Sequence, residues 1–539
     1  MNRLPVSRMR VKGSLYLLPI ILGTSHQQIN INPQHYHNLN PRTMSSSQLQ
    51  NNPPGEHGAN ASHVSGTRSL LNLAPEVVSN VIEQVDGNDT LKSLRLVNKS
   101  MDAHARRKLY EQVTLTPAHS AITRWQSIAD SETLSLLPRH ALIQTREDLD
   151  EHAQEGDPID EMDDFCDALA ALSKFPRLDS LELAFTNECQ GVASDEHWYM
   201  DVNEDLSHRV EILERVFRAI KNRMDDDGVP RSKIRSLTLR NLQNAPIDTF
   251  TDSELFSAVM QQLDELHIGM IQEYNEHGPD HDYKCLELQT FPGHLVAKWL
   301  KPVAANLKAL SLYSRNENWG CFPGYFDPSG ISFPKLETLS LGYYTLTYDD
   351  QLDWILAQKS LTKLVMHRCM IAPLMRIDKE NVREWKPSKQ GWEELSSRRG
   401  GDDWCNEFRY RGTWSQFFDK IADGLPNLKE FCFEYPKSEG SYDFELRQIW
   451  SGKGYGVENR DFCGGAEAFA KRYVVFNNGI LPTHWPEAKD DGEITDYFDP
   501  DDGEDQTANF HKEFLEEDQR SLERLLEKCR ARREATDGK

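Results

Sequence analysis

The chain has 539 residues, of which 38% are hydrophobic and 27% are charged, and its formal net charge is −24. This length is enough for roughly two to four domains with sizeable cores. A net charge this negative argues against nucleic acid as a partner, because nucleic-acid binding depends on Lys and Arg side chains that neutralise phosphates. The acidity is local: residues 147–167 carry a net −11, residues 487–518 a net −12, and all other residues together only −1.

The N-terminal region lacks the apolar residues of a folded domain. Residues 24–66 are rich in Asn, Gln, His, Ser and Pro, so we expect 1–67 to be a disordered leader. The apolar run from Leu15 to Leu22 is too short to span a bilayer. Because basic residues precede this run, an organelle-targeted protein stays an alternative. The nine scattered cysteines favour a reducing compartment, cytoplasmic or nuclear.

Order begins at Ser69 with a pattern that predicts two short helices. Pro75 suits a first helical turn, and Glu76 suits the positive end of the helix dipole. Aliphatic residues then recur at helical spacing up to Val85, and after a polar turn a second helix carries Leu91 and Leu94. A helical unit of this size buries little core by itself.

These residues resemble the F-box, whose pattern runs Leu-Pro-x-Glu, spaced aliphatics, a polar turn, and Leu-x-x-Leu-Arg-x-Val-Asn/Ser-Lys/Arg before an aromatic. The matching residues are Pro75, Glu76, Ile82, Leu91, Leu94, Arg95, Val97, Asn98 and Lys99, while Ala74 and Met101 replace the usual Leu and aromatic. The resemblance implies an F-box-like domain over residues 68–115 that binds a Skp-type adaptor. It also implies the contact residues, which are Leu71, Leu73, Pro75, Glu76, Val78, Ile82, Leu94, Arg95 and Val97.

Beyond this segment the motif apolar-x-x-apolar-x-apolar occurs seven times. The copies are Leu178/Leu181/Leu183, Ile234/Leu237/Leu239, Leu263/Leu266/Ile268, Leu307/Leu310/Leu312, Leu336/Leu339/Leu341, Leu361/Leu364/Met366 and Leu428/Phe431/Phe433. Three of the six intervals between copies are 25 or 29 residues, close to the roughly 20 to 29 residues of a leucine-rich repeat. Helical patterns fill the gaps, for example around Val216, Val259, Ile355 and Phe418.

A strand followed by a helix, repeated along the chain, predicts a solenoid in which each unit buries its face against its neighbours. The segment resembles an irregular leucine-rich-repeat array, because only Cys369 stands where the family pattern has Asn or Cys. The alternative is an unrelated α/β domain with leucine-rich strands. The predicted fold class is therefore α/β: a helical F-box-like hairpin, an irregular leucine-rich-repeat-like solenoid and a C-terminal helix.

The remaining boundaries follow from charge and periodicity. We interpret residues 116–170 as a helical and acidic linker, 171–480 as the repeat domain and 481–509 as a second acidic linker. Apolar residues at helical spacing, followed by Arg530, Arg532 and Arg533, predict a C-terminal helix over residues 510–534 that docks on the last repeats.

No catalytic motif emerges, and we expect neither an enzyme nor a bound cofactor or metal. The acidic and histidine-rich stretch 276–282 favours a solvated loop over a metal site, and the glycines of 452–456 favour a turn over a nucleotide site. A candidate substrate surface contains Trp385, Trp392, Trp404, Arg398 and Arg399, since Trp and Arg dominate binding hot spots. The alternative is that these rings cap the end of the solenoid core.

An F-box-like segment before a repeat domain resembles the substrate-recognition subunits of cullin-RING ubiquitin ligases, in particular the F-box proteins of filamentous fungi. The resemblance implies that the chain joins a Skp-type adaptor and cullin complex to a protein substrate, without nucleic acid or membrane as a partner. The alternative is a non-catalytic scaffold in which the F-box-like hairpin only caps the solenoid.

Overall fold

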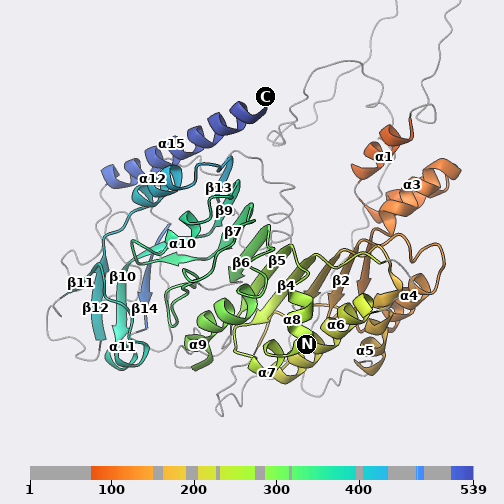
Figure 1. Ribbon diagram of the computed structural model, residues 1–539, viewed down its shortest axis with the longest axis horizontal. Coiled ribbons are helices and arrows are strands. Elements are labelled where there is room, and N and C mark those ends of the chain that lie inside the picture. Colours follow the sequence, from red (N-terminus) through yellow and green to blue (C-terminus); the bar gives the residue numbers. More distant parts are fainter. Residues whose placement is uncertain are drawn as a thin grey trace, which may run out of the picture. The chain divides into compact units, whose positions relative to one another are not determined.

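The computed structural model describes residues 74–85, 87–149, 162–189, 204–225, 231–272, 286–314, 318–395, 405–434, 469, 472–478 and 512–537. Nine of its strands form one sheet in which all neighbours are parallel and follow one another in chain order (Figure 1). They are β1 (Gln112–Leu115), β2 (His140–Gln144), β3 (Ser180–Ala184), β4 (Ser236–Gln243), β5 (Glu265–Ile271), β6 (Ala309–Ser314), β7 (Thr338–Gly342), β9 (Lys363–His367) and β13 (Glu430–Glu434). The chain is thus mixed α/β with a large parallel sheet, which confirms the α/β part of the predicted fold class.

All seven copies of the sequence motif form strands of this sheet, and they are in register. The second apolar residue of each copy pairs with its equivalent on the next strand, in the order Leu181, Leu237, Leu266, Leu310, Leu339, Leu364, Phe431. The third apolar residue lies on the same face, because side chains alternate along a strand. Both sets are buried in the main hydrophobic core. Leucine spacing therefore determines which face of the sheet is covered.

Charges alternate in sign along the residues that immediately precede the strands. The order across the sheet is Arg139, Asp179, Arg235, Asp264, Lys308, Glu337, Thr362, Lys429, each joined to the one before by a backbone hydrogen bond. Side-chain ion pairs join Arg139 to Asp179 (3.3 Å) and Arg235 to Asp264 (2.8 Å). Because like charges on neighbouring strands repel, this alternation favours the observed order and register.

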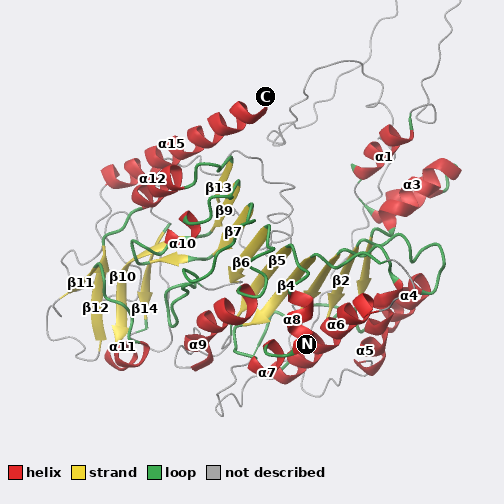
Figure 2. Cartoon of the chain, viewed as in Figure 1, coloured by secondary structure: helices red, strands yellow, loops and turns green. Residues whose placement is uncertain are grey.

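Helices cover the apolar face of the sheet (Figure 2). They are α4 (His119–Ala129), α5 (Met162–Ala170), η3 (Ala171–Lys174), α6 (Leu206–Asp225), α7 (Asp248–Thr251), α8 (Glu254–Met260), α9 (Leu286–His294), the π-helical turn η4 (Leu295–Leu300), α10 (Asp353–Leu356) and α12 (Trp414–Gly424). Aromatic rings join successive helices: Phe217 of α6 contacts Phe256 of α8 at 5.6 Å between centroids, and Phe256 contacts Trp299 of η4 at 5.0 Å. The helices predicted around Val216, Val259, Ile355 and Phe418 are all present.

The sheet begins earlier in the chain than predicted. Residues 116–170, interpreted as a linker, contain α4, β2 and α5, and β1 already precedes them. The linker interpretation is therefore wrong for these elements. The physical reason is that the motif positions of β1 and β2 hold residues such as Tyr110 and Ala141, which still reach the core but lack the leucine pattern.

A second, mixed sheet follows β9 directly. It contains β10 (Met370–Asp378), β11 (Trp392–Leu395), β12 (Cys405–Tyr410) and β14 (Tyr473–Asn477), and the short β8 (Thr345–Leu346) pairs with β10. Strand β12 is antiparallel to β10 and β11, whereas β14 and β8 are parallel to β10. Helix α11 (Lys379–Trp385) packs beside it. The repeat pattern gave no indication of this sheet, which belongs to the same core as the first.

Helical segments stand at both ends of the described chain. Before β1 lie α1 (Pro75–Glu83), α2 (Asn88–Arg95) and α3 (Lys99–Leu109), one helix more than predicted. At the other end α15 (Lys512–Asp537) corresponds to the helix expected over 510–534, and it packs on α12 and β13 (Figure 1). The leader 1–67 and the stretch 481–509 lie outside the described residues.

Candidate functional site

The three helices before β1, which we call the N-terminal helical unit (residues 74–109), are separated by local capping. Pro75 occupies the first turn of α1. The second helix predicted around Leu91 and Leu94 is present as α2, and the chain then turns at Leu96 and Val97. Asn98 then caps α3, since its side chain accepts a hydrogen bond from the Met101 backbone N–H at 2.9 Å. This capping pushes Leu96 and Val97 out of the helices and into solvent.

The N-terminal helical unit has a hydrophobic core of its own. The core consists of Val78, Ile82, Leu91, Met101 and Ala105, with Val85, Leu94 and Leu109 packed around it. The main core is a separate cluster that begins at Val113. The unit is therefore not an extension of the main core over the first strand.

The predicted adaptor-contact residues fall into two groups. Pro75, Glu76 and Val97 are exposed, Val97 to 61%. Val78 and Ile82 are only 4% and 3% exposed and belong to the unit's own core, as Leu94 does in part. Val78 and Ile82 therefore stabilise the unit and offer no contact surface while it is folded, whereas the half-buried Leu94 is partly accessible. Leu71 and Leu73 lie outside the described residues.

Arg95 of α2 contacts both α3 and Tyr110, the residue that ends α3. Its guanidinium pairs with Asp102 of α3 at 3.0 Å, and Arg106 pairs with the same carboxylate. These hydrogen bonds hold the pKa of Asp102 below its ordinary value. The guanidinium also lies over the ring of Tyr110, 5.9 Å from its centroid, and Tyr110 packs against the main core. Arg95 is therefore a positioning residue for the unit.

Two exposed apolar residues were not among the predicted contacts. Leu96 is 87% exposed and Val77 is 44% exposed, and with Val97 they give the unit three exposed large apolar side chains. The sequence does contain a signal for the exposure of Leu96. Asn98 is a preferred N-cap residue, so a new helix is expected to start there and the preceding helix must end before it. Exposed aliphatic groups of this kind are a candidate contact for another protein.

On the large sheet, the face opposite the leucines carries a row of mostly small or polar residues. Paired strand by strand, the row is Leu142, Glu182, Thr238, His267, Ser311, Ser340, Val365, Cys432. From Glu182 to Cys432 every residue of the row is buried. From Glu182 onward, the side chains of this row therefore offer no exposed surface to a ligand.

His267 and Ser311 of that row, together with Glu265 two residues earlier on β5, are arranged like a Ser-His-Glu catalytic set. His267 Nδ1 lies 2.8 Å from Ser311 Oγ, and His267 Nε2 lies 3.9 Å from a Glu265 carboxylate oxygen. The contact with His267 lowers the pKa of Glu265. Ser311 is only 1% exposed, so a substrate has no approach to its hydroxyl. The arrangement serves the fold and does not support hydrolysis.

The candidate substrate surface around the tryptophans is used largely inside the fold. Trp392 donates a 2.8 Å hydrogen bond to the carbonyl of Thr347, and its ring stacks on Tyr348 at 5.2 Å. Trp385 packs against the main core near Phe322. For these two residues the structure favours the alternative, in which the rings close the end of the core. Trp404, Arg398 and Arg399 lie outside the described residues.

No protein-family model matches the chain, and no curated protein matches it either. In the described part of the chain, every helix is too short or too polar to span a bilayer. The described residues also contain no cluster of three or more His, Cys, Asp or Glu side chains placed to bind a metal ion. The stretches 276–282 and 452–456 lie outside the described ranges.

Proposed function

We propose that the chain is the substrate-recognition subunit of an SCF-type cullin-RING ubiquitin ligase. In this proposal the N-terminal helical unit is an F-box domain that binds a Skp-type adaptor. The large sheet and its helices form an irregular leucine-rich-repeat solenoid that holds the protein substrate. Such a receptor performs no bond chemistry; it raises the effective concentration of a substrate lysine near a charged conjugating enzyme. Its expected location is the cytoplasm or the nucleus.

The observation that carries this proposal is the separate core of the N-terminal helical unit. In the scaffold alternative, the unit caps the solenoid and buries its apolar residues against the first strand. Instead, Val78, Ile82 and Leu91 pack among themselves, and Leu96 and Val97 remain exposed. A unit that folds around its own core and exposes aliphatic side chains is suited to docking on a second protein.

The order of the strands supports the solenoid part of the proposal. In doubly wound α/β sheets the strand order reverses at a switch point. Here nine parallel strands follow chain order throughout, as in repeat proteins whose units contact only their neighbours. Cys369, the one residue at the family's Asn/Cys position, donates from its Sγ to the carbonyl of Leu341 on the neighbouring strand at 3.5 Å.

Co-purification with the adaptor tests the proposal. The double variant Leu96→Asp with Val97→Asp changes two exposed residues, so the core of the unit stays intact. We expect it to lose the adaptor, because a carboxylate replaces an aliphatic contact. Leu136→Asp, at a residue that is 44% exposed outside the unit, is the matched control and keeps the adaptor.

Two results would count against the proposal. If the wild-type chain fails to retain the adaptor, the scaffold alternative is favoured. If the double variant retains the adaptor as well as the control does, Leu96 and Val97 are not the contact. Affinity purification with the proteasome inhibited then separates a ligase receptor, which accumulates ubiquitinated substrate, from a scaffold, which does not.

A further inference from the structure

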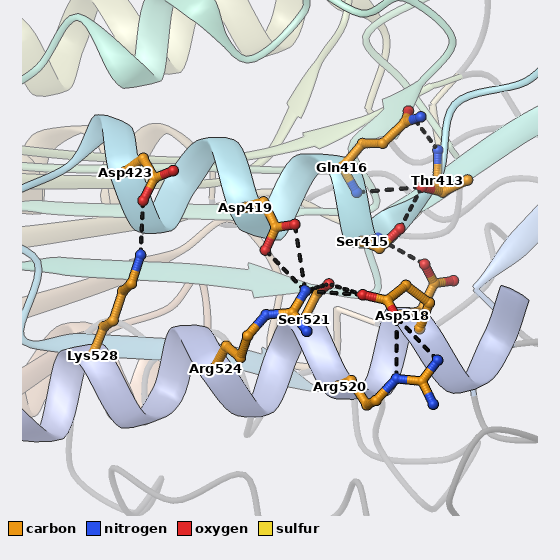
Figure 3. A network of polar contacts seen from close by, with 11 residues as sticks. Thr413, Ser415, Gln416, Asp419, Asp423, Asp518, Arg520, Ser521, Arg524 and Lys528 are labelled. Carbon is orange, nitrogen blue, oxygen red and sulfur yellow. Dashed lines mark hydrogen bonds and ion pairs between the residues drawn. The ribbon is translucent and has the colours of Figure 1, made fainter.

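A buried carboxyl group joins the C-terminal helix to the start of α12. Asp518 of α15 is fully buried, and its Oδ1 accepts a 2.7 Å hydrogen bond from the Ser415 backbone N–H (Figure 3). Its Oδ2 accepts a 2.5 Å hydrogen bond from the hydroxyl of Tyr473 on β14. Asp518 thereby connects three elements that are far apart in the sequence.

The same contacts complete the N-terminus of α12. The first turn of a helix leaves its backbone N–H groups without partners inside the helix. Here the Trp414 N–H donates to the Tyr473 hydroxyl oxygen at 3.2 Å, and the Ser415 N–H donates to Asp518. The Gln416 N–H donates to the capping side chain of Thr413 at 3.2 Å. Asp518 of α15 and Tyr473 of β14 therefore act with Thr413 as hydrogen-bond acceptors at the N-terminus of α12.

Farther along the helices, solvent-exposed ion pairs flank this buried contact. Arg524 pairs with Asp419 at 3.3 Å, and Lys528 pairs with Asp423 at 2.7 Å (Figure 3). Exposed pairs of this kind contribute little to stability, because water screens the charges. The apolar side chains that α15 buries are Leu515, Leu522, Leu525 and Cys529. Asp518 therefore provides the buried polar contact at the N-terminal end of α15, and Arg532 provides backbone contacts toward its C-terminal end.

Among the described groups that shift the pKa of Asp518, no cation offsets the cost of burying its negative charge. Burial raises the pKa of Asp518 to about 7, against the opposing effect of its hydrogen bonds from Tyr473 and Ser415. On its own helix, the neighbouring Glu517 raises this pKa further, although Glu517 is paired with Arg520 and Arg524. From α12 the nearest carboxylate, Asp419, is paired with Arg524.

From β14 and β12 the facing groups are phenols. Tyr473 is fully buried, and burial raises its pKa well above the ordinary value, so it stays neutral. Tyr410 of β12 donates to Asp349 at 2.9 Å, and its pKa is raised as well. Arg472, beside Tyr473, places its guanidinium over the ring of Phe433, 4.3 Å from the centroid.

We propose that the Asp518 carboxyl is a proton-dependent latch that holds the C-terminal helix on α12 more tightly at acidic than at neutral pH. When α15 detaches from α12, the Asp518 carboxyl enters water and its pKa returns to the ordinary value for Asp. The docked state therefore binds a proton that the undocked state releases, over the range between roughly pH 4 and pH 7. Docking is strongest below that range and weakens as pH rises through it. Release uncovers the apolar side of α12 and the adjacent part of β13.

Hydrogen exchange of the full-length chain, followed by mass spectrometry of peptides within 512–537, measures this directly. After correction for intrinsic exchange, the opening constant of α15 should rise roughly tenfold or more between about pH 5.5 and pH 8. In Asp518→Asn the side chain no longer titrates, so the opening constant should be nearly equal at the two pH values. Peptides from α6 provide an internal reference within the same molecule.

Asp423→Asn is the matched control, because it removes the exposed pair with Lys528 and leaves Asp518 in place. It should raise opening by the same factor at both pH values. If Asp518→Asn does not fold, Tyr473→Phe provides a second test. This variant removes a hydrogen bond that lowers the pKa of Asp518, so the transition should move to higher pH.

Three outcomes would overturn the latch. The first is a wild-type opening constant that changes less than about twofold across the range. The second is an Asp518→Asn protein that keeps the wild-type pH dependence. The third is a Tyr473→Phe protein whose transition stays at the wild-type pH. None of these results depends on adaptor binding, so the latch and the proposed ligase function fail or succeed separately.

Discussion

Arg532 of α15 makes the same set of contacts beside β13 that Arg223 of α6 makes beside β3. The Arg223 guanidinium donates to the carbonyls of Leu172, Phe175 and Leu178 and also to that of Ser232. The Arg532 guanidinium donates to the carbonyls of Ala422, Leu425 and Leu428, at the same spacing along the chain. Both arginines thus hold the proline-containing turn that leads into a strand.

The buried faces of the two helices also correspond. Seven buried or half-buried positions of α6, Leu206, Arg209, Ile212, Leu213, Val216, Ile220 and Arg223, have counterparts on α15 in Leu515, Asp518, Ser521, Leu522, Leu525, Cys529 and Arg532. The spacing between successive members is identical. The buried Phe217 and Ala219 of α6 correspond instead to the half-buried Leu526 and the exposed Lys528. Helix α15 therefore holds the turn before β13 through the same residue pattern with which α6 holds the turn before β3.

Replacement of these arginines should destabilise the protein unequally. Arg223→Met leaves four backbone carbonyls in a buried site, and we expect a loss of about 3 kcal/mol or more, since each unsatisfied buried group costs roughly 1–3 kcal/mol. Arg532→Met should cost less, about 1–2 kcal/mol, because its surroundings are partly exposed and water replaces the donor. Urea unfolding measures both values. An Arg532→Met cost equal to that of Arg223→Met would contradict the argument from burial.

The alternating charges before the strands give a second prediction. Asp264 lies between Arg235 and Lys308, at 2.8 Å and 3.8 Å. Asp264→Lys places three cations on adjacent strands and should destabilise the protein by about 1 kcal/mol. Asp264→Asn removes only the attraction and should cost less. High salt should reduce the difference between the variants, because it screens exposed charges. Unfolding at low and high salt tests this, and a salt-independent difference would exclude an electrostatic origin.

The features that could be predicted from the sequence are those in which apolar residues are buried at a regular spacing along the chain. The seven leucine motifs predict strands because the second and third apolar residues of each copy are two positions apart. In a strand this spacing places both side chains on one face, where the core covers them. The helices around Val216, Val259, Ile355 and Phe418 follow from the same periodicity. The alternating charges stand at a constant position of the motif, between Asp179 and Lys429, and the sequence contains that signal.

Other features depend on contacts between distant segments. Strand β14 pairs with β10 across about one hundred residues, and no local pattern indicates that pairing. Trp392 has the composition of a binding residue, and only the position of Thr347 and Tyr348 turns it into a packing residue. Asp518 lies in the acidic stretch 487–518, and nothing in its local sequence indicates that its side chain is buried. Asp518 is buried where the Ser415 backbone N–H and the Tyr473 hydroxyl donate hydrogen bonds to its carboxyl group.

Substitutions at Trp392 separate packing from recognition. Trp392→Phe keeps a ring beside Tyr348 but loses the hydrogen bond to Thr347, so we expect a loss of about 1 kcal/mol. Trp392→Ala also removes the ring and should cost about 2–4 kcal/mol. Urea unfolding measures these losses, and recovery of ubiquitinated substrate measures recognition. A Trp392→Phe protein of normal stability that recovers no substrate would restore the binding interpretation.

The acid sensitivity of the fold should depend on His367. Its ring lies between Tyr313 and Tyr343, 5.9 Å and 6.4 Å from their centroids, and is buried. Burial, with the charges of Arg368 and Arg472, lowers the pKa of His367 to about 3. The unfolded chain takes up this proton near the ordinary pKa of about 6.5. Stability from this group is therefore complete above that pH and is lost as pH falls toward about 3.

In His367→Gln this titration is absent, so the free energy of unfolding should fall less steeply between about pH 6.5 and pH 4.5 than it does in the wild-type protein. The proton uptake by Asp518 acts in the opposite direction over the same range, but it is common to both proteins and cancels in the comparison. His119→Gln, at an exposed histidine, is the control and should keep the wild-type slope. Urea unfolding at several pH values gives these slopes. Equal slopes for His367→Gln and the wild-type protein would mean that His367 is already protonated in the folded state.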